Sequence, residues 1–293
     1  MSLPHILLAL VNVVLWGFNF VVIKLGVSDV PPLFLSAMRY VFSSLPFILF
    51  FRKPDVPWKT IILFGMTIGF GQFALLFPAL KLGLPAGLAS LVLQVQAFFT
   101  MVLAAVLLGE KAGPARIFGA AVAFGGLGVI AVDRMHAATA FVPLLMCVGA
   151  ALSWAAANIV NRGVSKVDPI AFIVWTSLVP IVPLFALSWI VEGPEAIWAA
   201  ASSPSPAAIG SIAYLVFGAT LIGASIWSFL MARYPAAVVA PFSLLVPVVG
   251  MASAAIVFRE RVSGVETIGA ALIALGLVLN VFGGRIMTAL RVK

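Results

Sequence analysis

The chain has 293 residues, of which 63% are hydrophobic and only 9% are charged, and its mean hydropathy is +1.22. A soluble globular domain carries about 25% charged residues, so this composition excludes a water-soluble fold and predicts an all-α protein embedded in a lipid bilayer. The net charge of +8 does not indicate a nucleic-acid partner, because the basic residues are scattered singly through short loops. The single cysteine, Cys147, excludes a disulfide framework and a CxxC zinc motif.

Ten apolar segments follow one another along the chain, and each is long enough to cross about 30 Å of hydrocarbon as a helix. Turn residues separate them, such as Pro31-Pro32 and Asp168-Pro169. The first segment has neither a basic leader nor a small-residue cleavage site, so we expect a retained span and not a signal peptide. The ten predicted spans cover residues 5–25, 32–51, 60–81, 85–108, 115–132, 141–161, 170–191, 207–232, 235–258 and 265–284.

The distribution of lysine and arginine between the loops predicts the orientation. With the N-terminus in the cytoplasm, eleven of the 17 basic residues fall in cytoplasmic segments, five fall in the opposite segments, and Arg39 lies within a span. Cytoplasmic loops carry the excess of basic residues. The long loop near 192–206 is predicted on the other side, and it carries Glu192 and Glu195 and no base. We therefore expect both termini to lie in the cytoplasm.

The two halves of the chain repeat each other. Five spans per half is an odd number, so the second half enters the membrane from the opposite side, as in the inverted-topology repeats of secondary transporters. We predict a first five-helix repeat over 1–134, an inverted second repeat over 138–288, and a cytoplasmic tail over 289–293. The matching pairs are Trp16/Trp154, Lys24/Arg162, Pro31/Pro169 and Phe34/Phe172 at an offset of 138, and Pro85/Pro235, Ala86/Ala236, Glu110/Glu260, Lys111/Arg261, Gly119/Gly269 and Gly126/Gly276 at an offset of 150.

Besides these repeated residues, the chain contains five longer stretches, which include Trp16 to Val21 and Pro85 to Leu91. Together they resemble the EamA type of the drug/metabolite transporter superfamily, over essentially the whole chain. The resemblance implies ten helices, a central cavity between the repeats, alternating access, and export of amino acids and related metabolites. The chain is similar to exporters of the O-acetylserine/cysteine type and of the aromatic amino acid type. The stretches are Trp16-Gly17-Phe18-Asn19-Phe20-Val21 with Lys24, Pro85 to Leu91, Leu93 to Phe99, Gly109-Glu110-Lys111, and Ser243 to Val248 with Glu260.

Polar residues inside spans supply the first candidate substrate contacts, since they are costly there and usually face a cavity or a partner helix. The Arg39 guanidinium is suited to bind a substrate carboxylate, or alternatively to bond backbone carbonyls or to snorkel outward. Gln72, Gln94 and Gln96 offer donors and acceptors without charge. Gln94 and Gln96 point about 200° apart on a helix, so we expect one to line the cavity and the other to bond a neighbouring helix.

Asparagine, tryptophan and serine residues complete the candidate set. Asn19 and Asn158 follow the paired tryptophans and either line the cavity or join helices. The tryptophans either form apolar walls or lie at the membrane interface. The candidate substrate-binding residues are Trp16, Asn19, Arg39, Gln72, Gln94, Gln96, Trp154, Asn158, Trp175, Trp227 and Ser243.

Two further patterns concern packing and gating. The repeated glycines, such as Gly119 and Gly269, predict close approach of helices. Glu110-Lys111 and Glu260-Arg261 lie at equivalent span ends, where they either latch gates or are solvated.

Transport is favoured over catalysis, because the histidines His5 and His136 lie at the N-terminus and in a loop, and no paired carboxylate lies inside a span. An integral membrane enzyme is the alternative of another class, and a multidrug or other metabolite exporter is the alternative within the superfamily. Glu266 is the deepest acid, and we see no proton-coupling carboxylate, so we predict facilitated export. We expect a small-molecule substrate, no cofactor, no metal, no nucleic acid, and a monomer or weak homodimer in the bilayer.

Overall fold

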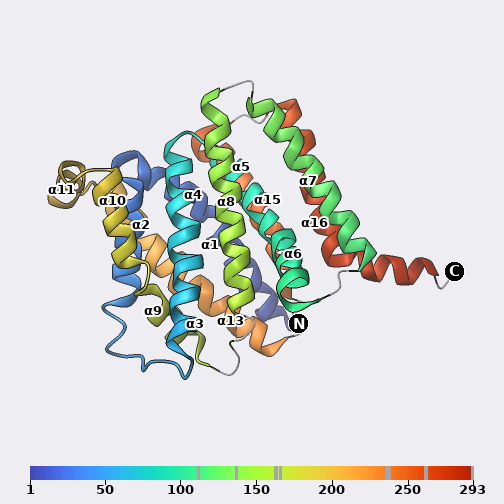
Figure 1. The fold of residues 1–293 in the computed structure, drawn as a ribbon, viewed down its shortest axis with the longest axis horizontal. Helices are drawn as coiled ribbons and strands as arrows, with labels where there is room; N and C mark the ends of the chain where they lie inside the picture. Colours follow the sequence, from blue (N-terminus) through green and yellow to red (C-terminus); the bar gives the residue numbers. More distant parts are fainter. Residues whose placement is uncertain are drawn as a thin grey trace.

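The computed structural model describes residues 1–110, 113–135, 138–161, 164, 167–234, 239–260 and 263–291, and every regular element within these ranges is helical (Figure 1). This confirms the all-α fold class. Six positions named in the sequence analysis lie outside the described residues, namely Lys111, His136, Arg162, Pro235, Ala236 and Arg261.

The first half of the chain forms five spans. Its elements are α1 (Leu3–Asp29), α2 (Pro32–Ser44), α3 (Trp58–Phe64), η1 (Gly65–Gly71), α4 (Gln72–Lys81), α5 (Ala86–Val92), η2 (Leu93–Val95), α6 (Gln96–Leu108) and α7 (Pro114–Met135). The third span joins α3, η1 and α4, and the fourth joins α5, η2 and α6.

The second half follows the same plan. Its elements are α8 (Ala138–Asn161), α9 (Pro169–Ser177), α10 (Ile181–Val191), α11 (Pro194–Ser202), α12 (Pro206–Ala213), η3 (Tyr214–Ile222), α13 (Gly223–Arg233), η4 (Ala240–Leu245), α15 (Val246–Phe258) and α16 (Gly264–Arg291). The seventh span joins α9 and α10, the eighth joins α12, η3 and α13, and the ninth joins η4 and α15.

Two predicted boundaries need correction. Helix α2 ends at Ser44, whereas the predicted span reaches residue 51, and successive turns follow it. Leu45 keeps helical dihedral angles, and its N–H still donates to the Val41 carbonyl. Pro46 contributes to the end of the helix because it has no backbone N–H to continue the helical hydrogen bonds. The predicted loop at 192–206 contains a short helix, α11, which has no buried residue. Gly193 permits the reversal before α11, since its φ is 82°.

Seven described helical segments are long and apolar enough to cross a membrane, and two shorter apolar segments cover Phe242–Phe258 and Gly264–Asn280. With α2 and its following turns, they make the ten spans. Because ten is even, the chain returns to the face where it began, and both chain ends lie at the lower side of Figure 1. We call this the terminal face. The opposite face carries residues 29–31, 82–85 and 192–206.

Irregular helical turns recur at equivalent places in the two halves. The π-helical turn η1 interrupts the third span, and η3 interrupts the eighth. The 3₁₀ turn η2 interrupts the fourth span, and η4 begins the ninth. Since π-helical and 3₁₀ turns inside α-helices are uncommon, their recurrence in both halves shows that the sequence repeat is also a structural repeat.

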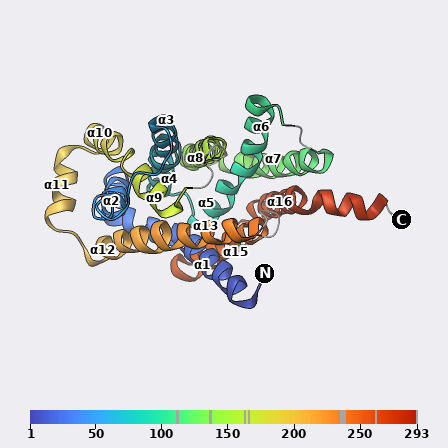
Figure 2. The same cartoon turned by 90° about the horizontal axis from the view of Figure 1, so that it is seen from below.

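Glycines join the fifth and tenth spans, α7 and α16, at one end of the molecule (Figures 1 and 2). A Cβ at Gly119 would lie 2.8 Å from the Gly276 carbonyl oxygen, and one at Gly126 would lie 2.6 Å from the Gly269 carbonyl oxygen. Gly119 of the first repeat is equivalent to Gly269 of the second, and Gly126 is equivalent to Gly276. Exchanging the two repeats therefore turns the Gly119–Gly276 contact into the Gly126–Gly269 contact. An approximate two-fold axis between α7 and α16 produces this crossed pairing, which confirms the packing role predicted for these glycines.

The two halves differ in how tightly they pack. Most of α4 is buried, including Gln72, Phe73 and Phe77. In α13, the equivalent helix of the second repeat, only Gly223 and Leu230 are buried among the described side chains. Helix α4 leads from the middle of the bundle to the opposite face, and α13 leads to the terminal face. The helix that leads to the terminal face is therefore less buried than its equivalent that leads to the opposite face.

Candidate functional site

Buried polar atoms without a partner single out three of the predicted substrate contacts. They are Oδ1 of Asn19, Nη1 of Arg39 and Oε1 of Gln72. A buried polar atom that makes no hydrogen bond costs about 1–3 kcal/mol, so such atoms are normally satisfied by protein, water or ligand. Asn19 lies on α1, Arg39 on α2 and Gln72 on α4, and these three helices pack on one another.

Arg39 is held by a hydroxyl and by an aromatic ring. Its Nε donates to Thr220 Oγ1 at 3.0 Å, and its guanidinium carbon lies 4.3 Å from the ring centroid of Phe73, the neighbour of Gln72. The side chain is only 6% exposed. It therefore does not snorkel outward, and the hydrogen bond it makes is to a side chain and not to a backbone carbonyl. Nη1 remains available to a carboxylate.

The π-helical turn η3 connects Arg39 with Trp16. The indole Nε1 of Trp16 donates to the Ala219 carbonyl at 3.1 Å, one residue before the Thr220 that binds Arg39. The Trp16 ring lies 5.3 Å from the ring of Trp227 in α13. Gly223 makes room for this indole, because a Cβ there would lie 2.6 Å from Trp16 Nε1. Trp16 and Trp227 thus pack on each other, and Trp16 is bonded to the same π-helical turn that binds Arg39.

These groups lie near the middle of the bundle. A helix rises about 1.5 Å per residue, so Asn19 and Gln72 lie about 15 Å from the ends of α1 and α4 at the opposite face. This is roughly half the thickness of the hydrocarbon core. The two acceptors therefore lie at mid-membrane depth, where transporters bind their substrates. Arg39 lies about 10 Å from the start of α2 at the opposite face.

The remaining polar candidates bond other helices. Gln96 Oε1 accepts from Asn158 Nδ2 at 2.7 Å, which joins α6 to α8. Gln94 Nε2 donates to the Ser243 carbonyl at 2.9 Å, which joins η2 to η4. Both glutamines thus make interhelical hydrogen bonds, whereas the sequence predicted this for only one of them.

The two remaining tryptophans are placed differently from Trp16 and Trp227. Trp154 is half-buried and packs against the main core. The indole of Trp175 donates to the Phe51 carbonyl at 2.9 Å, and its ring lies edge-on to Trp58. Trp175 therefore lies near the terminal face, where tryptophan is favoured at the membrane interface.

Three further buried residues with unpaired polar atoms, Asn12, Ser36 and Ser43, were not predicted. Asn12 is 1% exposed, and neither its amide nitrogen nor its amide oxygen has a partner. It precedes Trp16 and Asn19 by one and two helical turns, so the three side chains form one stripe on α1. This spacing of Asn12, Trp16 and Asn19 is visible in the sequence, so helical periodicity could have identified Asn12. Thr220 was also missed, because a threonine in an apolar span carries no such signal.

Glu260 joins three elements at the opposite face, and we call this group of contacts the latch. Lys24 Nζ lies 2.6 Å from Glu260 Oε1, and the same carboxylate accepts from the backbone N–H groups of Ala86 and Gly87 at 2.9 and 3.1 Å. It thereby joins α1, α5 and the end of α15. A carboxylate at a helix N-terminus is stabilised by the free N–H groups and the helix dipole. Glu260 is therefore bonded to neighbouring elements and is not a solvated helix end.

Comparison with known proteins agrees with this architecture. The model of the EamA-like transporter family matches residues 3–132 and again residues 142–282. A solved crystal structure with 22% sequence identity superposes with a TM-score of 0.64, covering 96% of this chain and 98% of the other, so the two share a fold.

Sequence relatives extend over nearly the full chain. A protein of Escherichia coli (strain K12) named "Probable amino-acid metabolite efflux pump" is 42% identical over 297 residues, which cover 100% of this chain and 99% of the relative. A "Probable terminal-alkyne amino-acid exporter" of Streptantibioticus cattleyicolor is 30% identical, over 95% of this chain and 94% of the relative. With both halves matched and relatives of this similarity, the chain belongs to the EamA-like transporter family of integral membrane proteins.

Proposed function

We propose that this protein exports amino acids and related small metabolites from the cytoplasm across the bacterial inner membrane. The names of the relatives, an amino-acid metabolite efflux pump and an amino-acid exporter, support this substrate class. The excess of basic residues in the segments on the N-terminal side supports cytoplasmic termini. In this orientation the terminal face is the cytoplasmic face.

The observation that carries the proposal is the chemistry of the three unpaired polar atoms. A zwitterionic amino acid presents a carboxylate, which needs donors, and an ammonium, which needs acceptors. Arg39 Nη1 is a free donor with a positive charge, and Asn19 Oδ1 and Gln72 Oε1 are free acceptors. We propose that Arg39 binds the carboxylate and that the two amide oxygens bind the ammonium.

An apolar wall of Trp16 and Trp227 receives the substrate side chain in this proposal. The two rings offer extended aromatic surface, and aromatic residues commonly line ligand pockets. We therefore keep Trp16, Asn19, Arg39, Gln72 and Trp227 as substrate contacts. The other six candidates, Gln94, Gln96, Trp154, Asn158, Trp175 and Ser243, we assign to helix packing.

Alternating access follows from the two repeats. The latch of Glu260 with Lys24 and the first turn of α5 holds the opposite face closed. The sparser burial of α13 favours entry of substrate from the terminal face. We propose that rocking of the repeats opens the latch and exposes the same site to the outside.

Export is proposed to be facilitated by the substrate gradient. All nine acidic residues lie at helix ends or in connections, and a proton-coupled exporter generally uses a carboxylate at membrane depth. Glu266, the deepest acid, accepts from the Ser263 backbone N–H at 3.0 Å, while its own N–H donates to Ser263 Oγ at 3.0 Å. This capping box at the start of α16 accounts for its burial.

The remaining assignments are also proposals. The repeats cover 1–134 and 138–288, and 289–293 form a cytoplasmic tail, in agreement with the two regions matched by the family model. We propose that the protein catalyses no reaction, uses no cofactor, metal or nucleic acid, and works as a monomer or weak homodimer.

Efflux from proteoliposomes tests the proposal. Vesicles are loaded with a mixture of amino acids, and their release is followed for the wild-type chain, Arg39→Gln and Arg52→Gln. Arg52 is an exposed arginine of the loop after α2, so its variant is the matched control. We expect selective efflux from wild type and Arg52→Gln, and at least tenfold slower efflux from Arg39→Gln. Release of uncharged drugs without release of any amino acid would instead favour the multidrug alternative.

A further inference from the structure

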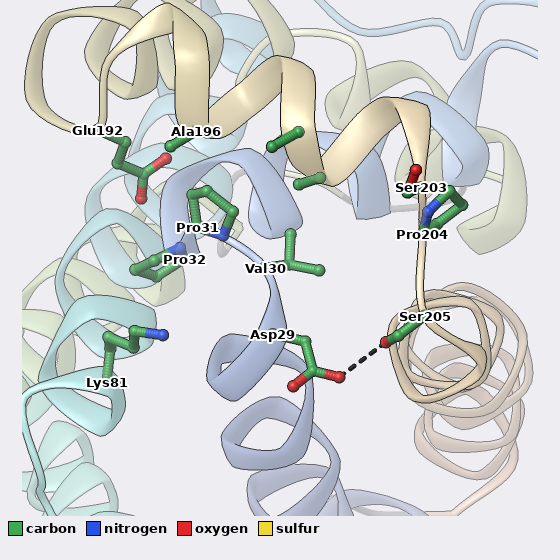
Figure 3. Close-up of a pocket in the computed structure, with 12 residues that line it drawn as sticks. Asp29, Val30, Pro31, Pro32, Lys81, Glu192, Ala196, Ser203, Pro204 and Ser205 are labelled. Atoms are coloured by element: carbon green, nitrogen blue, oxygen red, sulfur yellow. Dashed lines mark hydrogen bonds between the residues drawn. The ribbon is translucent and has the colours of Figure 1, made fainter.

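A cavity lies at the opposite face, and none of the proposed mid-membrane contacts lines it. It has a volume of about 470 Å³ and lies between the turn that joins α1 to α2, the end of α4, and helix α11 (Figure 3). Its polar lining includes Asp29, Lys81, Glu192 and Ser205, and Pro32 and Ala199 contribute apolar surface.

Two opposite charges face this cavity without pairing with each other. Lys81 Nζ donates to the Ser28 carbonyl at 3.0 Å. Asp29 accepts from Ser28 Oγ at 3.2 Å and from Ser205 Oγ at 2.7 Å, the bond drawn in Figure 3. Lys81 and Asp29 are both described, and they form no ion pair with each other. Each charge is fixed by neutral groups and remains available for a charged ligand.

The third charge, on Glu192, is already used. Its Oε1 accepts from the Leu33 N–H at 2.6 Å, and its Oε2 accepts from the Phe34 N–H at 3.1 Å. Ser188 Oγ also donates to Oε2 at 2.5 Å. Glu192 therefore caps the first turn of α2, and its negative charge is balanced there by the helix N-terminus. One cation and one anion are left for a ligand, and this favours a zwitterion over a simple anion or cation.

We propose that this cavity is a second amino-acid site on the non-cytoplasmic side, in which Lys81 binds the carboxylate and Asp29 binds the ammonium. The ligand class rests on the proposed function. Pro32 and Ala199 supply the apolar surface that a substrate side chain contacts. Asp29 lies on α1 a little more than one helical turn beyond the latch residue Lys24, so the second site adjoins the exit that the latch controls.

Helix α11 forms the outer wall of the site. Its residues Ala196 and Ala199 line the cavity, while Trp198 is 74% exposed on the same helix. The helix has no buried residue, and it is joined to α10 through Gly193 at φ 82°. A ligand that bridges Lys81 and Asp29 closes the cavity against α11.

Equilibrium binding to the purified full-length protein in nanodiscs tests the proposal, with L-leucine, L-leucinamide and 4-methylpentanoate as probes. L-Leucinamide lacks the carboxylate, and 4-methylpentanoate lacks the ammonium. Arg39→Gln removes the mid-membrane site and leaves the second one. In this background we expect Lys81→Met and Asp29→Asn each to weaken L-leucine binding about tenfold. The Lys81→Met variant should also bind L-leucine no better than L-leucinamide, because the partner of the carboxylate is gone. The Asp29→Asn variant should bind L-leucine no better than 4-methylpentanoate, because the partner of the ammonium is gone.

Control variants and a second background keep the two sites distinguishable. Glu195→Gln on α11 and Lys59→Met on α3 remove exposed charges that do not line the cavity, and we expect them to bind L-leucine as the parent does. If Arg39→Gln binds L-leucine like wild type, the mid-membrane site is wrong, and the Lys81 and Asp29 comparisons still decide the second site. L-leucine binding that neither Lys81→Met nor Asp29→Asn weakens, in either background, overturns the second site, and so does absence of binding to all variants.

Discussion

At the scale of single residues, unpaired polar atoms separate the proposed substrate contacts from residues that bond other helices. Arg39 was predicted from its residue type and its depth in a span. Its partner Thr220 is more than 180 positions away along the chain and was not predictable. Gln94 and Gln96 carry the same amide as Gln72, yet both bond other helices, while Gln72 keeps a free oxygen. Residue type therefore identifies the candidate residues, and the hydrogen bonds that each one makes in the folded protein distinguish them.

Replacement of Asn12 by leucine tests whether its free amide serves transport. Asn12→Leu removes two buried polar atoms that have no partner, so we expect the free energy of unfolding to rise by about 1–3 kcal/mol. We expect efflux to fall if the polar stripe on α1 guides the substrate. Thermal unfolding in detergent and vesicle efflux measure the two effects. Asn161→Leu, at the exposed end of α8, is the control. A destabilised Asn12→Leu would show that the amide is satisfied in the folded protein.

At the scale of elements, helical irregularities position the site. The π-helical turn η3 places the Ala219 carbonyl and the Thr220 hydroxyl next to each other, towards Trp16 and Arg39. Thr220 Oγ1 itself donates to the Leu215 carbonyl five residues earlier, the spacing of a π-helix. The apolar pattern predicted a continuous span here. Hydrophobicity does not distinguish α-helical from π-helical turns, so the irregular turns had to come from the structure.

Two adjacent glycines on α7 offer a matched test of helix packing. A Cβ at Gly126 would lie 2.6 Å from the Gly269 carbonyl oxygen, whereas a Cβ at Gly125 would meet nothing within 4 Å. We expect Gly126→Ala to destabilise the protein by about 1–3 kcal/mol, because backbone of α16 must move. Gly125→Ala should be neutral or slightly stabilising, since alanine favours a helix. Thermal unfolding of both variants decides the matter, and equal melting temperatures would contradict close packing of α7 on α16.

At the scale of the whole molecule, an inverted repeat makes two conformations of similar energy possible, and local contacts choose between them. In the described structure Glu260 joins three helices at the opposite face, and we propose that these contacts hold that face closed. The latch residues Lys24 and Glu260 are only 24% and 14% exposed. Their pairing therefore biases the conformational equilibrium more than a fully exposed pair would.

Weakening the latch should open the opposite face. Glu260→Gln removes the ion pair with Lys24, which we expect to be worth about 1 kcal/mol, or about a fivefold larger open population. A cysteine introduced by Asn19→Cys reports opening through its reaction with a membrane-impermeant maleimide added outside. The native Cys147 is buried and serves as an unreactive reference. Glu195→Gln is the control, and unchanged labelling of Glu260→Gln would argue against the latch.

The absence of an acid at membrane depth predicts the response to a pH gradient. We expect amino-acid efflux from proteoliposomes to change less than twofold when a pH gradient of about 2 units is imposed at constant substrate gradient. An ionophore that collapses the gradient provides the control. Strong acceleration by the pH gradient would contradict facilitated export and would point to one of the nine acids as a proton carrier.

The sequence by itself determined the solvent, the number of spans and the inverted repeat, because apolar length, loop charge and residue spacing are properties of the chain alone. It also identified Arg39, Asn19 and Gln72 as candidates. Only the tertiary structure decided which polar groups remain unpaired, where α2 ends, that α11 forms, and which elements Glu260 joins. These depend on contacts between distant segments, such as Arg39 with Thr220 and Glu260 with Lys24, and local patterns carry no information on which segments meet.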